Sequence, residues 1–434
     1  MLVCTTISSA YEFTPELGLR VELHDNAFQS ANDAEEDISY QPYAGFKFVN
    51  EGERLYASID FLVEYEKYQD TFDDDTRLFI DAYLGWGIIP GRLIWNLQDS
   101  ASIQRINALG FDLPDNTQRV NVLATGPELY YERNVWRTIA KAQVSQVTYE
   151  ESDEFDASGL SASVSLFRDL NAYSSLCLSL SYSENEYDEL STILIPVLPG
   201  STATTTFTQS DYEVTTYALV YNRELPYGRL IAKVGQNSLD DDAETIDEAY
   251  YDLRLVYDAG SSLVAGLTVS SELTDPIVNS FNPDDTRIRL DGIRAPNRLG
   301  SNDNQSYHLL EQLALDIRYE AGRYHPQVQV FNTSRDYYGV EPEEDEFGVR
   351  GSLLIDLTQR SGVTLSASRT ELDYVNLDTE DTNTNLEIAY NYEILDGITF
   401  QAGYGRNKRS SNLGNRDGDD NIFFLEINYL GEAR

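Results

Sequence analysis

Apolar and polar residues alternate along most of the chain, in short segments that are separated by turns. The segment from Phe347 to Leu357 shows the pattern clearly, with Val349, Leu353 and Ile355 in the apolar set and Arg350 and Asp356 in the polar set. Successive side chains of a strand point to opposite faces. The segment is therefore predicted as a strand with one apolar and one polar face, and a second alternating segment follows the turn at residues 359–362.

The same hairpin recurs along the whole chain, from a first strand at about residues 14–22 to a last strand at about 422–430. Connections after even-numbered strands are tight, as at 50–52 and 395–397, and those after odd-numbered strands are long and acidic, as at 25–37 and 240–247. The two longest loops are 184–210 and 274–306. This layout predicts an all-β fold, a transmembrane antiparallel β-barrel of about 20 strands, with short periplasmic turns and long acidic outer loops.

Two other all-β folds fit parts of the pattern. The hairpins repeat at about the length of a propeller blade, but propeller strands are shorter and no blade signature is present. A soluble sandwich is not expected to sort its loops by length onto two ends. The barrel is therefore the preferred interpretation.

Composition narrows the class further. The 434 residues include 30 Tyr and carry a net charge of -42. Disorder would explain the charge but not the aromatic residues, and the acidity argues against binding of nucleic acid. No apolar run approaches the roughly 20 residues of a membrane helix. We expect the chain in the cell outer membrane, in contact with its lipids and with lipopolysaccharide.

The start of the chain is typical of the end of a secretory signal. Small residues at Ser8 and Ala10 fit cleavage after Ala10. We therefore interpret residues 1–10 as the remnant of a signal peptide and residues 11–434 as a single outer-membrane β-barrel domain. The alternative is that Cys4 is a lipoprotein acceptor, although the preceding Val3 is larger than the small residue expected there.

Several segments resemble the exosortase (PEP-CTERM) system-associated outer-membrane β-barrels. The residues that carry the resemblance are the loop at 110–116 leading into 120–130, and the segments 24–28, 50–68, 221–225 and 358–362. Related barrels accompany exopolysaccharide synthesis clusters. The resemblance implies a role in polysaccharide export or surface assembly, and it brings no catalytic residues.

The candidate site residues are charged side chains that the alternation places on the lumen face: Asp252, Arg254, Asp316, Arg318, Arg350 and Asp356. Rings of charge in a pore govern which solutes pass, but such charges also pair with one another and stiffen the wall. Lumen aromatics such as Tyr56, Tyr250 and Phe331 are suited either to stack on sugar rings or to fill space.

No enzyme, cofactor or metal site is expected. Catalysis on such a barrel needs a nucleophile and a base placed together, and the three His (His24, His308 and His325) are dispersed. Acidic runs at 73–75, 240–242 and 417–420 offer oxygen ligands for divalent cations, without the spacing of a calcium loop. A solvated acidic surface is the plainer interpretation.

The sequence thus predicts a passive outer-membrane pore or scaffold in exopolysaccharide secretion or surface assembly. The alternatives are a general diffusion porin and a surface adhesin with a closed lumen. The position of the 274–306 loop, inside the pore or across its mouth, would discriminate between them.

Overall fold

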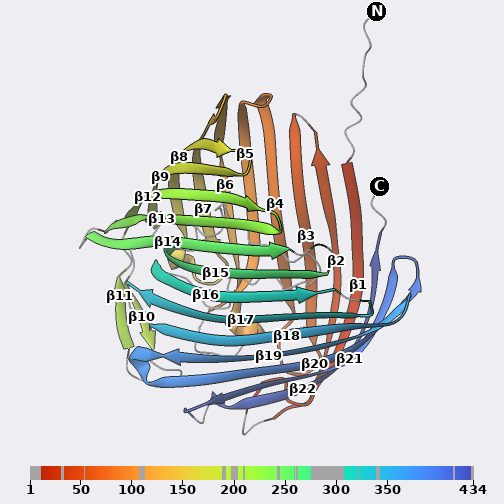
Figure 1. The fold of residues 1–434 in the computed structure, drawn as a ribbon. Coiled ribbons are helices and arrows are strands. Elements are labelled where there is room, and N and C mark those ends of the chain that lie inside the picture. Colours follow the sequence, from red (N-terminus) through yellow and green to blue (C-terminus); the bar gives the residue numbers. More distant parts are fainter. Residues whose placement is uncertain are drawn as a thin grey trace, which may run out of the picture.

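The computed structural model describes residues 11–30, 34–52, 54–106, 113–187, 192–196, 204–208, 211–241, 245–258, 260, 262–274, 307–320, 322–338, 343–413 and 416–431. Twenty strands form one closed antiparallel sheet (Figure 1). The sheet closes because β1 (Tyr11–His24) pairs with both β2 (Asp37–Glu51) and β22 (Gly418–Leu430). The predicted signal remnant and nearly all of the 274–306 loop lie outside the described residues.

The other barrel strands follow in chain order, and each pairs with the barrel strand before it and with the barrel strand after it. They are β3 (Leu55–Tyr68), β4 (Asp75–Ile89), β5 (Leu93–Arg105), β6 (Thr117–Arg133), β7 (Trp136–Tyr149), β8 (Ala157–Asn171), β9 (Ser174–Tyr187), β12 (Tyr212–Leu225), β13 (Gly228–Asp241), β14 (Thr245–Asp258), β15 (Leu263–Thr274), β16 (His308–Tyr319), β17 (Tyr324–Tyr337), β18 (Glu344–Thr358), β19 (Ser361–Tyr374), β20 (Thr379–Leu395) and β21 (Ile398–Ser411). Single 3-10 turns occur at η1 (Pro114–Asn116), η2 (Asp153–Phe155) and η3 (Val375–Leu377).

The predicted sorting of connections is confirmed for most strand pairs. The 240–247 segment is an exception, because it was predicted as a long loop whereas β13 extends to Asp241 and β14 begins at Thr245. Tight turns join β4 to β5 and β20 to β21, where Gly91 and Gly397 have φ of 69° and 81°. An L side chain is disfavoured at such angles, which is why glycine serves in these turns. Longer connections within the described residues, such as 69–74 and 150–156, leave from strand ends at the opposite end of the barrel. In the part of the chain that the structure describes, no helix is long and apolar enough to cross a membrane.

The two faces of the sheet differ as the alternation predicts. The outward face is apolar and exposed, with Leu17, Leu253 and Ile427 among its residues. The inward face carries polar side chains, many of them partly or fully buried. An apolar outer belt around a polar lumen is the pattern that lipid imposes on a barrel.

Two details differ from the sequence prediction. The 184–210 loop contains a short hairpin of β10 (Thr192–Pro196) and β11 (Thr204–Thr208), which forms a separate sheet. Tyrosines near strand ends usually form an aromatic girdle on the lipid side, and Tyr68 and Tyr130 depart from that rule. Instead the ring of Tyr68 lies 5.9 Å from that of His24, and the Tyr130 hydroxyl donates to the inward Glu128.

Candidate functional site

The two ends of the lumen differ in exposure. At the loop end, inward polar side chains are buried: Ser39, Glu66, Asn185, His308, Thr379, Asp381 and Asp420 are each at most 2% exposed. Nearer the turns, inward charges face open space, as with Lys47 and Asp60, whose side chains are 52% and 46% exposed. Glu16 and Asn96 are buried exceptions near the turns. In the described residues the lumen is therefore more tightly packed at its outer end.

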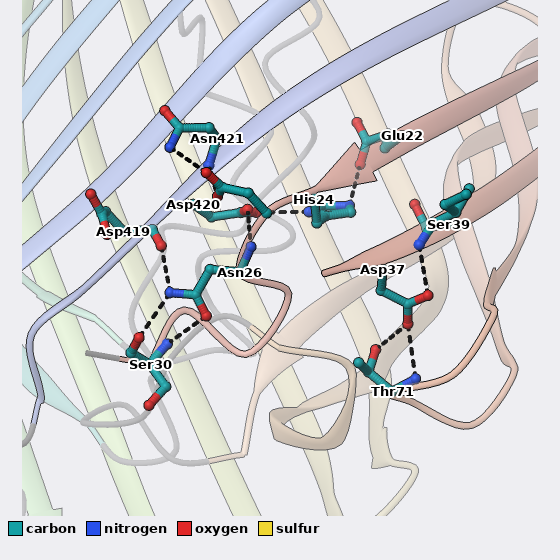
Figure 2. Close-up of polar contacts among 12 residues, drawn as sticks. Glu22, His24, Asn26, Ser30, Asp37, Ser39, Thr71, Asp419, Asp420 and Asn421 are labelled. Carbon is teal, nitrogen blue, oxygen red and sulfur yellow. Dashed lines mark hydrogen bonds and ion pairs between the residues drawn. The ribbon is translucent and has the colours of Figure 1, made fainter. Parts of the chain in front are cut away.

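A buried charged network closes the barrel at the outer end of the β1–β22 seam (Figure 2). His24 ends β1, and its Nδ1 lies 2.7 Å from the Asp420 carboxylate while its Nε2 lies 3.3 Å from the Glu22 carboxylate. An imidazole that faces two carboxylates satisfies both by carrying two protons. His24 thereby joins the last residues of β1 to the first residues of β22.

The loop after β1 is fastened to β22 beside this pair. The backbone N–H of Asn26 donates to Asp420 at 3.1 Å, and its side-chain amide donates to the carbonyl of Asp419 at 2.7 Å. Asn421 donates through its backbone and its side chain to the two carboxylate oxygens of Asp25, each at 2.7 Å. Figure 2 shows the Asn26 bonds converging on the start of β22. This group, residues 24–26 with 419–421, is called the seam clamp below.

The network continues around the wall to β4. The Gln41 amide donates to Glu66 at 2.7 Å and to Glu22 at 3.4 Å, and Arg77 pairs with Glu66 at 2.5 Å. Arg20 pairs with Glu22 at 2.6 Å. An unbroken line of hydrogen bonds and ion pairs therefore crosses the inner face from β22 through β1, β2 and β3 to β4.

The next outer loop is anchored by Asp37 at the start of β2. Its carboxylate accepts hydrogen bonds from the backbone N–H groups of Gln69, Asp70 and Thr71, and from the Thr71 hydroxyl at 2.5 Å (Figure 2). Beside it, the ring of Phe72 packs against those of Phe28 and Tyr68, with centroids 4.9 Å apart in both pairs. The loops after β1 and β3 are thus held together at the barrel mouth.

Two further charge clusters lie at the outer end of the wall, on the other side of the seam, one on β17 and β18 and one on β20 and β21. Arg335 on β17 lies 3.5 Å from Glu344 and 3.3 Å from Glu346 of β18. Asp381 on β20 receives Arg409 at 2.6 Å and the loop residue Arg416 at 2.7 Å. Burial and the neighbouring Arg409 guanidinium lower the pKa of Arg416. Both clusters tie an outer loop or strand end to the wall.

The predicted site residues on β14 form one tight group. Asp252 is 1% exposed and lies 3.0 Å from Arg254 and 3.4 Å from Lys233 of β13. This group matches the interpretation in which lumen charges pair and stiffen the wall. Lys233 is the partner that alternation alone did not identify.

The other four predicted residues lie on β16 and β18 and do not gather at one point. Arg318 lies 3.6 Å from Glu320, and Asp356 lies 2.9 Å from His325. The guanidinium of Arg350 lies 4.7 Å from the centre of the Phe331 ring. Asp316 is hydrogen-bonded to Gln329 of β17. The Arg350–Phe331 contact thus brings a predicted charge and a predicted lumen aromatic together.

Sequence reasoning missed the seam clamp. Asp420 had been grouped with a solvated acidic loop, whereas it is buried in the first residues of β22. Its inward position could have been read from the alternation through Phe423, Leu425 and Ile427. Its partner His24 could not have been predicted, because the sequence of neither strand determines the register in which β1 pairs with β22. Among the described residues, no group of three or more His, Cys, Asp or Glu side chains is placed to hold a metal ion.

Comparison with known proteins defines the fold and little beyond it. No family model and no curated protein matches the chain. It is similar to the FrpB iron transporter of Neisseria meningitidis, F3-3 variant, with a TM-score of 0.51 and 8% identity over 98% of this chain and 82% of that one. It is also similar to the ferric enterobactin receptor PfeA of Pseudomonas aeruginosa, with a TM-score of 0.50 and 11% identity over 98% of this chain and 82% of the receptor.

These observations define the class of protein. A closed barrel of twenty antiparallel strands has an apolar outer belt, a polar lumen and loops sorted by length onto two ends. The protein is an outer-membrane β-barrel located in the cell outer membrane, where its belt contacts membrane lipids and lipopolysaccharide.

Proposed function

We propose that this barrel provides a passive polar pathway for a hydrophilic polymer in exopolysaccharide secretion or surface assembly, and that its outer end is the closed end of that pathway. The observation that supports the proposal is the contrast in burial along the lumen. Exposed inward charges such as Lys47, Asp60 and Asp356 lie near the turns, and buried ones such as Glu66, Asp381 and Asp420 lie near the loops.

The chemistry of the lumen favours a hydrophilic solute. Its open part combines charged groups with aromatic rings, as where Arg350 lies over Phe331. Mixed polar and aromatic surfaces suit sugars, which present hydroxyl groups at the edges of their rings and C–H groups on the faces. The resemblance of five segments to exosortase-associated barrels supports a polysaccharide in particular. The proposal involves no catalytic step and no resident cofactor.

The alternatives make different use of the same lumen. A general diffusion porin needs a permanently open pathway, which the packed outer end disfavours. An adhesin with a closed lumen agrees with that packing but leaves the exposed inner charges without a role. Uptake of an iron chelate, as the names of the similar structures suggest for those proteins, is a further candidate; an overall likeness at 8–11% identity supports the fold alone.

Single-channel conductance of the refolded protein in a planar bilayer tests the proposal. We expect brief openings from a mostly closed state, because the seam clamp and the Asp381 cluster hold the outer end. Neutral oligosaccharides added on the turn side should shorten the openings, because they enter the exposed part of the lumen. Divalent cations are expected to stabilise the closed state if the acidic outer loops bind them, and chelation should then raise the open time.

The outcomes separate the candidates. A steady large conductance that is indifferent to oligosaccharides would favour the general porin. Absence of conductance from protein that is shown to be folded would exclude a pathway and leave the adhesin.

A further inference from the structure

We propose that the lumen wall formed by β16 to β21 carries a binding row for an uncharged, polyhydroxylated chain such as a neutral glycan. This inference rests on the proposed function and names the substrate class. The row consists of Asp316, Gln329, Arg350, Ser368, Asn385 and Asn407, one residue from each of six consecutive strands. It is called the polar row below.

The register of the sheet brings these six residues together. Asp316 is paired with Gln329, Gln329 with Arg350, and Arg350 with Ser368. Ser368 is paired with Asn385, and Asn385 with Asn407. Neighbouring strands lie about 4.8 Å apart, a distance similar to the length of one sugar unit. The row therefore offers one hydrogen-bonding side chain at each step across the wall.

The polar row climbs through the lumen. Asp316 lies close to Tyr319, the turn-side end of β16, whereas Asn407 lies close to Ser411, the loop-side end of β21. The next residue in register is Asp420 of the seam clamp. Strands of such barrels tilt by roughly 40°, so a line across them rises along the barrel axis. The row thus leads from the open inner part of the lumen to the closed outer end.

The side chains of the row are accessible to a ligand. Arg350 and Asn385 are exposed and the other four are half-buried, in contrast to the buried clamp residues. Bonds within the row are few: the Asn385 amide donates to the Ser368 hydroxyl at 3.3 Å, and Gln329 bonds Asp316. Arg350 contacts the face of Phe331. Amides and hydroxyls that point into water retain donors and acceptors for a solute.

Charge decides the class of ligand. Four members of the row are neutral, and the charges of Asp316 and Arg350 cancel. The parallel row continues this chemistry with Gln327, Ser352 and Ser366 on β17 to β19. Its flanking residues, Arg318 on β16 and Glu387 on β20, again carry opposite charges. A charged polymer would lose water at such a surface without gaining an opposite charge, whereas a neutral chain exchanges hydrogen bonds with water for equivalent ones with the wall. The wall therefore suits a neutral glycan better than a uronate polymer.

Titration calorimetry on the folded full-length barrel tests this inference, in a detergent without a sugar headgroup. The probes are an isomaltohexaose, which is neutral, and a hexagalacturonate, which is anionic. We expect the neutral probe to bind and the double variant Asn385→Leu with Asn407→Leu to weaken its binding about tenfold, because each amide loses roughly one hydrogen bond. The control is Asn222→Leu, an inward half-buried Asn on β12 outside the row, which should leave the affinity unchanged.

Each other result overturns the inference. The first is that the wild-type barrel, shown to be folded by its gel mobility, does not bind the neutral probe. The second is that the double variant binds the neutral probe as tightly as the wild type. The third is that the wild-type barrel binds the anionic probe more tightly than the neutral one. If the double variant does not fold, Ser368→Ala takes its place, with a smaller expected loss of about threefold. Conductance that oligosaccharides block equally in wild type and double variant would retain the proposed function and remove the polar row.

Discussion

At the residue scale, the protein concentrates its buried charge where the barrel closes. Asp420 is 1% exposed and accepts from the ring of His24 and from the backbone of Asn26. Its neighbour Asp419 faces the other side of the strand, with its side chain 49% exposed and paired with Arg406. Two adjacent aspartates thus experience different environments because of the alternation of the strand. Removing a buried partner leaves the remaining charges uncompensated, whereas an exposed pair contributes little.

This contrast predicts the effect of two matched substitutions. Asp420→Ala should lower the free energy of unfolding by about 3 kcal/mol, because His24 loses a buried carboxylate. Asp419→Ala should change it by less than about 0.5 kcal/mol, because the bond from Asn26 goes to the Asp419 carbonyl and survives. Urea unfolding from lipid vesicles measures both. Equal losses for the two variants would show that the seam clamp is not a stabilising unit.

At the element scale, close approach of backbones fixes some positions in the wall. A Cβ on Gly126 of β6 would lie 1.9 Å from the carbonyl oxygen of Ala142 on β7, which neither strand can relieve by moving a side chain. A Cβ on Gly405 of β21 would have its nearest neighbour at 3.8 Å. Both glycines lie within strands, and they differ in how closely the backbone of the neighbouring strand approaches the position of the added Cβ.

Substitution by alanine should separate these positions. Gly126→Ala is expected to destabilise the barrel by about 1–3 kcal/mol through overpacking against β7. Gly405→Ala should leave the stability unchanged or raise it by up to about 1 kcal/mol, because it restricts the unfolded chain. The measurement is the temperature at which the folded band of each variant converts to the unfolded band on a gel. A tolerated Gly126→Ala would mean that the β6–β7 contact is looser than the structure shows.

The elements were predictable and their pairing partners were not. Each of the twenty barrel strands follows from alternation of the kind seen in residues 347–357, because lipid on one side and water on the other force a period of two. The same alternation placed Asp252 and Arg254 on the lumen face. It could not place Lys233 beside Asp252, or Asp420 beside His24, since those contacts depend on the register between strands. The polar row depends on the pairing register between six strands, so it cannot be predicted from the sequence of any single strand.

At the scale of the whole molecule, the lumen wall is electrically uneven. On the side of the seam, from β20 through β22 to β4, inward carboxylates outnumber cations in the described ion-pair network: Glu22, Asp60, Glu64, Glu66, Asp75, Asp381, Asp420 and Glu426 face Arg20, His24, Lys47, Arg77, Arg409 and Arg416. The chain as a whole carries a net charge of -42. A pathway lined in this way attracts cations and repels anions.

Ion selectivity should therefore favour cations whenever the barrel conducts. In a planar bilayer with a KCl gradient, the reversal potential should have the sign that potassium permeation gives. High salt should reduce the preference, because it screens the wall charges. A reversal potential of zero or of chloride sign would contradict the charge assignment of this wall.

The central claim is that the lumen is open towards the turns and closed towards the loops, and sided labelling tests it most directly. Lys47→Cys places a thiol in the exposed inner part of the lumen, in a background where Cys4 and the buried Cys177 are both replaced by Ser. The barrel is reconstituted in one orientation, and an impermeant maleimide is added on either side. We predict fast labelling from the turn side and slow labelling from the loop side. Equal labelling from both sides would show an open pore and contradict the account.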